Sequence, residues 1–138
     1  MTTFQECEIA KVDEAQRLVG GYAYVSHDQD GLPIVDNEGD FVPTPEELEK
    51  AAVGFMLDHR SGDVWHNETL VAKAVESVVL TPEKMDAMGI QKAGMPQGAW
   101  WVTWKVLDDT TWDLVQKGLL RSMSIGGRGL RTPVEVVS

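Results

Sequence analysis

The stretch from Ala99 to Leu107 limits the possible folds of this chain more than any other. One set of alternate positions holds Trp100, Val102, Trp104 and Val106, and the other holds Trp101, Thr103, Lys105 and Leu107. Successive side chains of a β-strand point to opposite faces, and aromatic and β-branched residues favour strands. The stretch therefore predicts a strand with two tryptophans and two valines on one face.

Other apolar stretches predict further strands, and most are bounded by turn residues or by glycine. They cover Phe4 to Ala10, Gly21 to Ser26, Leu70 to Leu80 and Leu119 to Gly129, with a short strand that ends at His66. In the last segment, Leu130 to Val137, Pro133 indicates an edge strand or a break. The charged segment from Lys11 to Leu18 is predicted to be a turn or a short helix.

Three helices are predicted, two of them from the same start signal. Thr44-Pro45-Glu46-Glu47 places an N-cap, a proline at the first helical position and the glutamate of a capping box, so a helix should run from Pro45 to about Leu57. Thr81-Pro82-Glu83 begins a second helix that stops near Gly89, and a third should cover Thr110 to Lys117. The core face of the first helix is expected to consist of Leu48, Ala51, Ala52, Phe55 and Met56.

The order of these elements predicts an α+β domain. Strands and helices do not alternate in the sustained way that a parallel sheet requires. We therefore expect residues 1–138 to form a single domain, a mostly antiparallel β-barrel or curved sheet decorated by about three helices.

Composition excludes several function classes. Twelve basic and twenty-two acidic residues give a net charge of −10, so we expect no nucleic-acid binding, and a partner protein should offer basic or neutral segments. No apolar run approaches the ~20 residues of a membrane span, and the N-terminus lacks the features of a signal peptide. Cys7 is the only cysteine, which suits a reducing cytoplasm, and we expect it to be a half-buried strand thiol.

The histidines do not predict a metal site. No spacing of histidine and cysteine typical of zinc is present, so no metal and no cofactor are expected. His27 precedes an acidic loop and is most simply a solvated side chain, and His59 follows the long helix. His66 ends a short strand at a turn, where a side chain can serve either structure or catalysis.

The strand from Leu119 to Gly129 runs into glycines in a way that suits a catalytic serine. Leu120, Ser122, Ser124 and Gly126 are expected to share one face. Ser124 is followed by backbone with little side-chain cover, whose amide groups could face a developing oxyanion. The stretch opens no helix, which excludes the nucleophile elbow of an α/β-hydrolase.

Five blocks of sequence, taken in order, resemble one family. The chain is similar to the XkdF-type phage serine proteases, which are relatives of the tailed-phage prohead proteases and, more distantly, of herpesvirus assemblin. The resemblance covers roughly residues 20 to 130. It rests on residues 35–42 with the helix that follows, residues 63–67, residues 74–77 with 81–83, residues 98–101 with 105–109 and Trp112, and residues 123–127.

The resemblance implies a fold and an activity. The family fold is a small, assemblin-like β-barrel surrounded by helices. Its members are proteases of the immature capsid in the host cytoplasm, where they cut segments of the scaffold and of the major capsid protein, and often themselves. Whether the chain forms a homo-oligomer is left open.

The resemblance also assigns roles to residues. The family's histidine falls on His66 and its serine on Ser124, while Glu76 is the first choice for the third member and Glu135 and Asp40 are alternatives. Ser122 stands where relatives often have glycine. The oxyanion would be held by amides of Ile125, Gly126 and Gly127, helped by the Arg128 guanidinium, although a surface charge is the simpler interpretation of Arg128.

Two other functions compete with the protease. One is a catalytically idle capsid-assembly or scaffold-binding domain on the same fold, and the other is a plain acidic interaction domain. The presence of serine, histidine and a nearby acid in the matching blocks favours the enzyme.

Overall fold

A computed structural model of the protein describes residues 6–58, 72–124 and 129–131. Its three helices are α1 (Pro45–Asp58), α2 (Pro82–Met88) and α3 (Asp109–Gln116). The strands are β1 (Glu6–Glu8), β2 (Lys11–Asp13), β3 (Leu18–His27), β4 (Ala72–Leu80), β5 (Gly98–Val106), β6 (Leu120–Ser124) and β7 (Gly129–Arg131). None of the helices within these ranges is long and apolar enough to cross a membrane.

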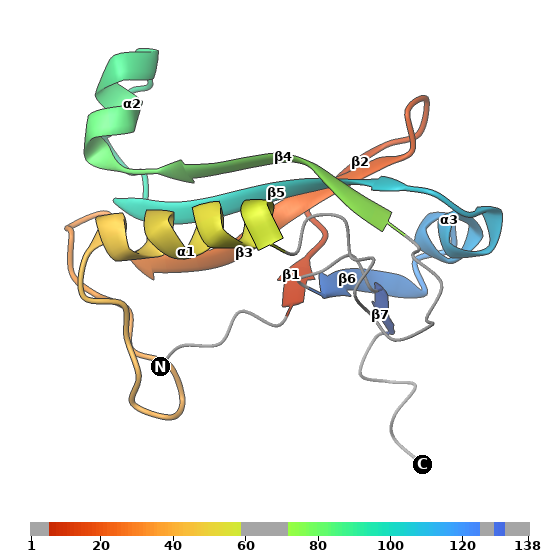
Figure 1. The fold of residues 1–138 in the computed structure, drawn as a ribbon, viewed down its shortest axis with the longest axis horizontal. Coiled ribbons are helices and arrows are strands. Elements are labelled where there is room, and N and C mark those ends of the chain that lie inside the picture. The colour runs from red at the N-terminus through yellow and green to blue at the C-terminus, as the bar shows by residue number, and fades with distance from the viewer. Residues whose placement is uncertain (1–5, 59–71, 125–128, 132–138) are drawn as a thin grey trace.

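The strands form two antiparallel sheets, and the chain passes between them from β1 to β2 and again from β5 through α3 to β6 (Figure 1). The large sheet has the order β2-β3-β5-β4 and the small sheet the order β1-β6-β7. Between β1 and β2 the amide of Ile9 donates to the Arg121 carbonyl at 2.7 Å, and the next amide, of Ala10, donates to the Gly20 carbonyl at 2.8 Å. The chain therefore passes directly from the small sheet into the large one.

This arrangement confirms the α+β class, the antiparallel strands and the three helices. The predicted β-barrel is not found, because the described residues form two separate sheets and no closed barrel. β4 is an edge strand of the large sheet and β7 an edge strand of the small sheet, and within the described residues the two do not pair.

Local side-chain bonds explain where the helices begin. The Thr44 hydroxyl accepts the Glu47 amide at 3.2 Å, and the Thr81 hydroxyl accepts the Lys84 amide at 3.1 Å. α2 ends at Gly89, whose φ of 73° is in the left-handed region that glycine adopts readily. The first two predicted helices are thus confirmed, while α3 starts one residue earlier than expected because Asp108 caps it.

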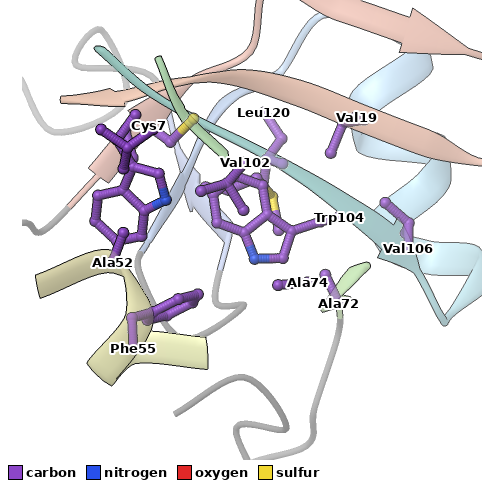
Figure 2. Close-up of a cluster of buried hydrophobic side chains, with 14 of the residues drawn as sticks. Cys7, Val19, Ala52, Phe55, Ala72, Ala74, Val102, Trp104, Val106 and Leu120 are labelled. Atoms are coloured by element: carbon purple, nitrogen blue, oxygen red, sulfur yellow. The ribbon is translucent and has the colours of Figure 1, made fainter. Parts of the chain in front are cut away.

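The core lies between the large sheet, α1 and the small sheet. Trp100, Val102, Trp104 and Val106 of β5 are at most 1% exposed, which confirms the predicted buried face of this strand. We call this face of the large sheet the inner face. The ring of Phe55 from α1 meets that of Trp100 edge-on at 5.4 Å, and Leu120 of β6 and Cys7 of β1 close the cluster from the small sheet (Figure 2).

Gly21 allows the small sheet to approach the inner face closely. A Cβ atom at this position would lie 1.9 Å from the Glu8 carbonyl oxygen and 3.2 Å from the Cys7 sulfur. β1 can therefore cross β3 only where β3 has no side chain. As a result Cys7 is fully buried, and the expectation of a half-buried thiol was wrong.

The segment from Lys11 to Leu18 is a β-hairpin, so of the two predicted alternatives the turn is present and the short helix is not. The Asp13 carboxylate accepts the Gln16 amide at 3.1 Å and the Gln16 side chain at 3.0 Å, which tightens the turn and lowers the pKa of Asp13. Arg17 then takes a positive φ of 56°, and β3 starts at the next residue. Pairing of β2 with β3 outweighs the charge pattern because the hairpin extends an existing sheet.

Candidate functional site

Ser124 is the last residue of β6, the middle strand of the small sheet. Its Cα lies opposite Glu6 of β1, and Ser122 lies opposite Glu8. On the other side β6 pairs with β7, so strands flank it on both edges. The backbone that carries the predicted nucleophile is therefore held at the end of a hydrogen-bonded strand.

Apart from the candidate acids Glu76 and Asp40, the other parts of the predicted site lie outside the described residues. These parts are the side chain of Ser124, all of His66, and the oxyanion stretch from Ile125 to Arg128. The alternative acid Glu135 lies outside them as well. The pairing of Ser124 with His66 accordingly stays a prediction.

A β-bulge changes which residues of β6 face the core. The register shifts between Leu120 and Ser122, and both Leu120 and Met123 are buried, at 6% and 0% exposure. A bulge inserts one residue into a strand and so reverses the alternation beyond it. The predicted common face of Leu120 and Ser122 was therefore wrong: Met123 joins Leu120 in the core, Arg121 is exposed, and Ser122 is half-buried.

Glu76 lies on the other face of the large sheet. It pairs with Thr103 after a bulge in β4 and is exposed. It lines a small hollow of about 120 Å³ together with Gly20, Trp101 and other residues of this outer face. A Cβ atom on Gly20 would meet the Trp101 ring at 2.9 Å, which places that ring against β3 on the outer side. The large sheet thus separates Glu76 from the small sheet that contains Ser124.

Asp40, the other alternative acid within the described residues, closes a tight turn. Its amide donates to the Asp36 carboxylate at 2.8 Å, and its carbonyl accepts the Asp36 amide at 2.8 Å. Gly39 supplies the positive φ of 84° that this turn needs. The turn belongs to the connection between β3 and α1.

Sequence reasoning missed a buried serine–histidine pair at the end of β3. Ser26 Oγ lies 2.8 Å from His27 Nδ1 and 3.3 Å from the Gly98 carbonyl oxygen, and His27 Nε2 lies 3.2 Å from the Pro43 carbonyl oxygen. Ser26 is 0% and His27 3% exposed, so the expectation of a solvated His27 was wrong. In the sequence, the one indication that His27 is buried was that the strand pattern of β3 continues through residue 27.

This buried pair has a structural role. A peptide substrate cannot reach a hydroxyl that is fully buried, and a Cβ atom on Gly98 would lie 2.5 Å from Ser26 Oγ. The pair links β3, β5 and the segment just before the Thr44 cap, so it helps to place the start of α1.

A groove of about 420 Å³ runs between α1 and β4, and we call it the α1–β4 groove. Mostly apolar side chains of α1 form one wall, and consecutive residues of β4 form the other. Its lining consists of Glu49, Ala52, Val53, Met56, Leu57, Ser77, Val78, Val79 and Lys84. Within the described ranges, no group of three or more histidine, cysteine or carboxylate side chains is placed to hold a metal ion.

Comparison with known proteins points to one family. The family model described as "Putative phage serine protease XkdF" matches residues 6–132. Over 121 residues the chain is 33% identical to the uncharacterized protein YqbD of Bacillus subtilis strain 168, a match that covers 86% of this chain and 34% of that protein. Over 115 residues it is 31% identical to the phage-like element PBSX protein XkdF of the same strain, covering 83% of this chain and 38% of that protein.

The chain therefore spans little more than a third of the length of the curated relatives it matches. No solved structure matches it.

Proposed function

Because the chain belongs to the family of XkdF-type phage serine proteases, we propose that it is a serine endopeptidase of capsid maturation. Its substrates would be segments of the scaffold and of the major capsid protein, and the place of action would be the immature capsid in the host cytoplasm. The observation that carries the proposal is the position of Ser124 at the end of β6, within a family match that spans residues 6–132.

In the proposed mechanism, His66 removes the proton from the Ser124 hydroxyl as the oxygen attacks the scissile carbonyl. His66 then returns the proton to the leaving amine, and water hydrolyses the acyl-enzyme. Amides of Ile125 to Gly127, with the Arg128 guanidinium beside them, would stabilise the oxyanion. Removing one such donor typically costs about 3–4 kcal/mol of transition-state stabilisation.

Glu76 is the proposed third member, and its position sets a geometric condition. Because Glu76 lies on the outer face beside Thr103, it can orient the imidazole only if His66 reaches that face. If His66 lies on the side of the small sheet, Asp40 or Glu135 takes this role. Glu76→Gln then leaves the cleavage rate unchanged.

The test of the proposed function is cleavage of a co-expressed scaffold protein and of the major capsid protein, followed by mass spectrometry. Ser124→Ala should lower the cleavage rate by about four orders of magnitude or more while the domain stays folded. His66→Ala should cost about as much, and the double variant little more, because members of one catalytic unit do not act additively.

Ser122→Ala is the matched control on the same strand and should keep most of the activity. If Ser124→Ala processes both substrates as well as the unaltered protein does, with host proteases controlled for, the protease proposal is wrong. If the unaltered protein itself processes neither substrate, the chain is the catalytically idle capsid-assembly or scaffold-binding domain.

A further inference from the structure

The α1–β4 groove exposes apolar surface that the described helices and strands do not cover. Phe55 and Leu48 point from α1 into the core, yet Val53 and Leu57, one turn apart on another side of the helix, are 53% and 78% exposed. Both line the groove, together with the half-buried Met56. This helix therefore carries more apolar surface than the large sheet buries.

The opposite wall of the groove is a backbone edge. β4 is an edge strand of the large sheet, and within the described ranges only β5 pairs with it. Ser77, Val78 and Val79 all line the groove. Successive side chains of a strand point to opposite faces, so three consecutive residues can share one groove only along the edge of the strand.

Hydrogen bonding at this edge supports the same orientation. The Val79 carbonyl accepts the Thr81 amide at 3.2 Å, so it is turned away from β5. Backbone groups two residues apart in an antiparallel strand point the same way. The N–H and C=O groups of Ser77 therefore face the groove, where a strand laid alongside could pair with them.

The charges around the groove favour a basic occupant. Acidic residues of α1 and α2, the two helices beside the groove, outnumber the basic ones. This excess remains after Glu49 is paired with Lys84 and Asp86 with Lys92. The acidic residues of the two helices are Glu46, Glu47, Glu49, Asp58, Glu83 and Asp86, and the basic ones are Lys50 and Lys84. This local excess has the same sign as the net charge of −10 of the whole chain.

We propose that the α1–β4 groove binds an extended segment of the protein substrate, which adds to β4 as a further strand. The segment would place apolar side chains at alternate positions against Val53 and Leu57 and basic side chains at its two ends. The role as a substrate site rests on the proposed function. It also fits the chain order, since residues 59–71, which join α1 to β4, include His66.

A binding experiment on the Ser124→Ala variant tests this site without cleavage. The probe is a fluorescein-labelled decapeptide with valine at alternate positions, threonine between them and lysine at both ends, and the readout is fluorescence anisotropy. We expect saturable binding that is at least about tenfold tighter than for the same peptide with glutamate in place of lysine. Val53→Ser and Leu57→Ser should each weaken binding roughly tenfold.

Two controls make the test specific. Leu32→Ser removes a side chain that is 61% exposed and outside the groove, so it should leave binding unchanged. Two N-methylated peptides, methylated on alternate amides in the two possible registers, test backbone pairing, because only one register presents its amides to β4. One of the two should lose binding and the other should keep it.

Several outcomes would overturn the proposal. They are no saturable binding at 1 mM peptide, equal binding by the groove variants and the parent, or equal binding by both N-methylated peptides. A concentration-dependent dimer in sedimentation that Leu57→Ser abolishes, without peptide binding, would assign the groove to a second copy of the chain.

The proposed function is tested separately, by the cleavage assay with Ser124→Ala. An active protease that fails to bind the probe would disprove the groove site alone. Probe binding by a chain without cleavage activity would disprove the protease instead.

Discussion

Thr44 supplies an acceptor at the start of α1, where the first backbone amides have no partner within the helix. Thr44→Ala should therefore lower the free energy of unfolding by about 1 kcal/mol, whereas Thr44→Ser should keep most of it. A urea titration measures this as a lower midpoint with an unchanged slope. An unchanged midpoint in the alanine variant would show that the hydroxyl contributes nothing to the helix.

Single residues also decide how closely backbones approach. Gly21 admits β1 against β3, and Gly98 admits the Ser26 hydroxyl beside β5. Neither glycine has a positive φ. Glycine is therefore required at these two positions because a side chain would not fit, and not because of the backbone conformation. Such requirements come from a neighbour that is distant in the chain.

At the scale of elements, the bulge in β6 is the feature with the clearest energetic consequence. Leu120 and Met123 are both buried although they are three residues apart. Leu120→Ala and Met123→Ala should each lower the free energy of unfolding by about 2–5 kcal/mol, as for other buried large side chains. Arg121→Ala, at the exposed position between them, should change it by less than about 0.5 kcal/mol.

Thermal or chemical denaturation of the three β6 variants checks this pattern. A regular strand would place Leu120 and Met123 on opposite faces. If Met123→Ala is as mild as Arg121→Ala, β6 alternates without a bulge, and the orientation of Ser122 has to be revised with it.

At the scale of the whole molecule, Cys7 reports on the contact between the two sheets. It is fully buried, and burial, with a smaller effect of the Glu8 charge, raises the pKa of its thiol from 9.0 to about 12. The thiolate is the reactive form, so native protein at pH 8 should react with a disulfide reagent only as fast as the sheets separate. In guanidinium chloride one thiol per chain should react at once.

The same shift predicts a loss of stability at alkaline pH. The thiol ionises near pH 9 in the unfolded chain and only near pH 12 in the folded one. The contribution of the protonated Cys7 thiol to the free energy of unfolding is therefore complete below pH 9 and falls as the pH rises toward 12. Cys7→Ala should flatten the dependence of the free energy of unfolding on pH between pH 9 and pH 12.

The labelling experiment has its own contradicting outcome. Rapid labelling of native Cys7 at pH 8 would mean that the small sheet does not close over this thiol.

The sequence by itself determined the features that neighbouring residues control. Two such features are the helix caps at Thr44 and Thr81 and the alternation of side chains from Ala99 to Leu107. Each depends on residues only a few positions apart, and the structure confirms both. The ordered blocks also identified the family, since a set of short motifs in sequence order is itself a sequence property. The assignment of Ser124, His66 and Glu76 to one site goes further and stays a prediction.

Only the tertiary structure decided the features that depend on pairing between distant strands. The two-sheet arrangement, the bulge that turns Met123 inward and the burial of His27 all follow from register with partners far along the chain. The position of Glu76 is of the same kind, because a bulge in β4 and pairing with Thr103 set it on the outer face. One residue more or less in a strand reverses the faces, and a local pattern carries no information about that count.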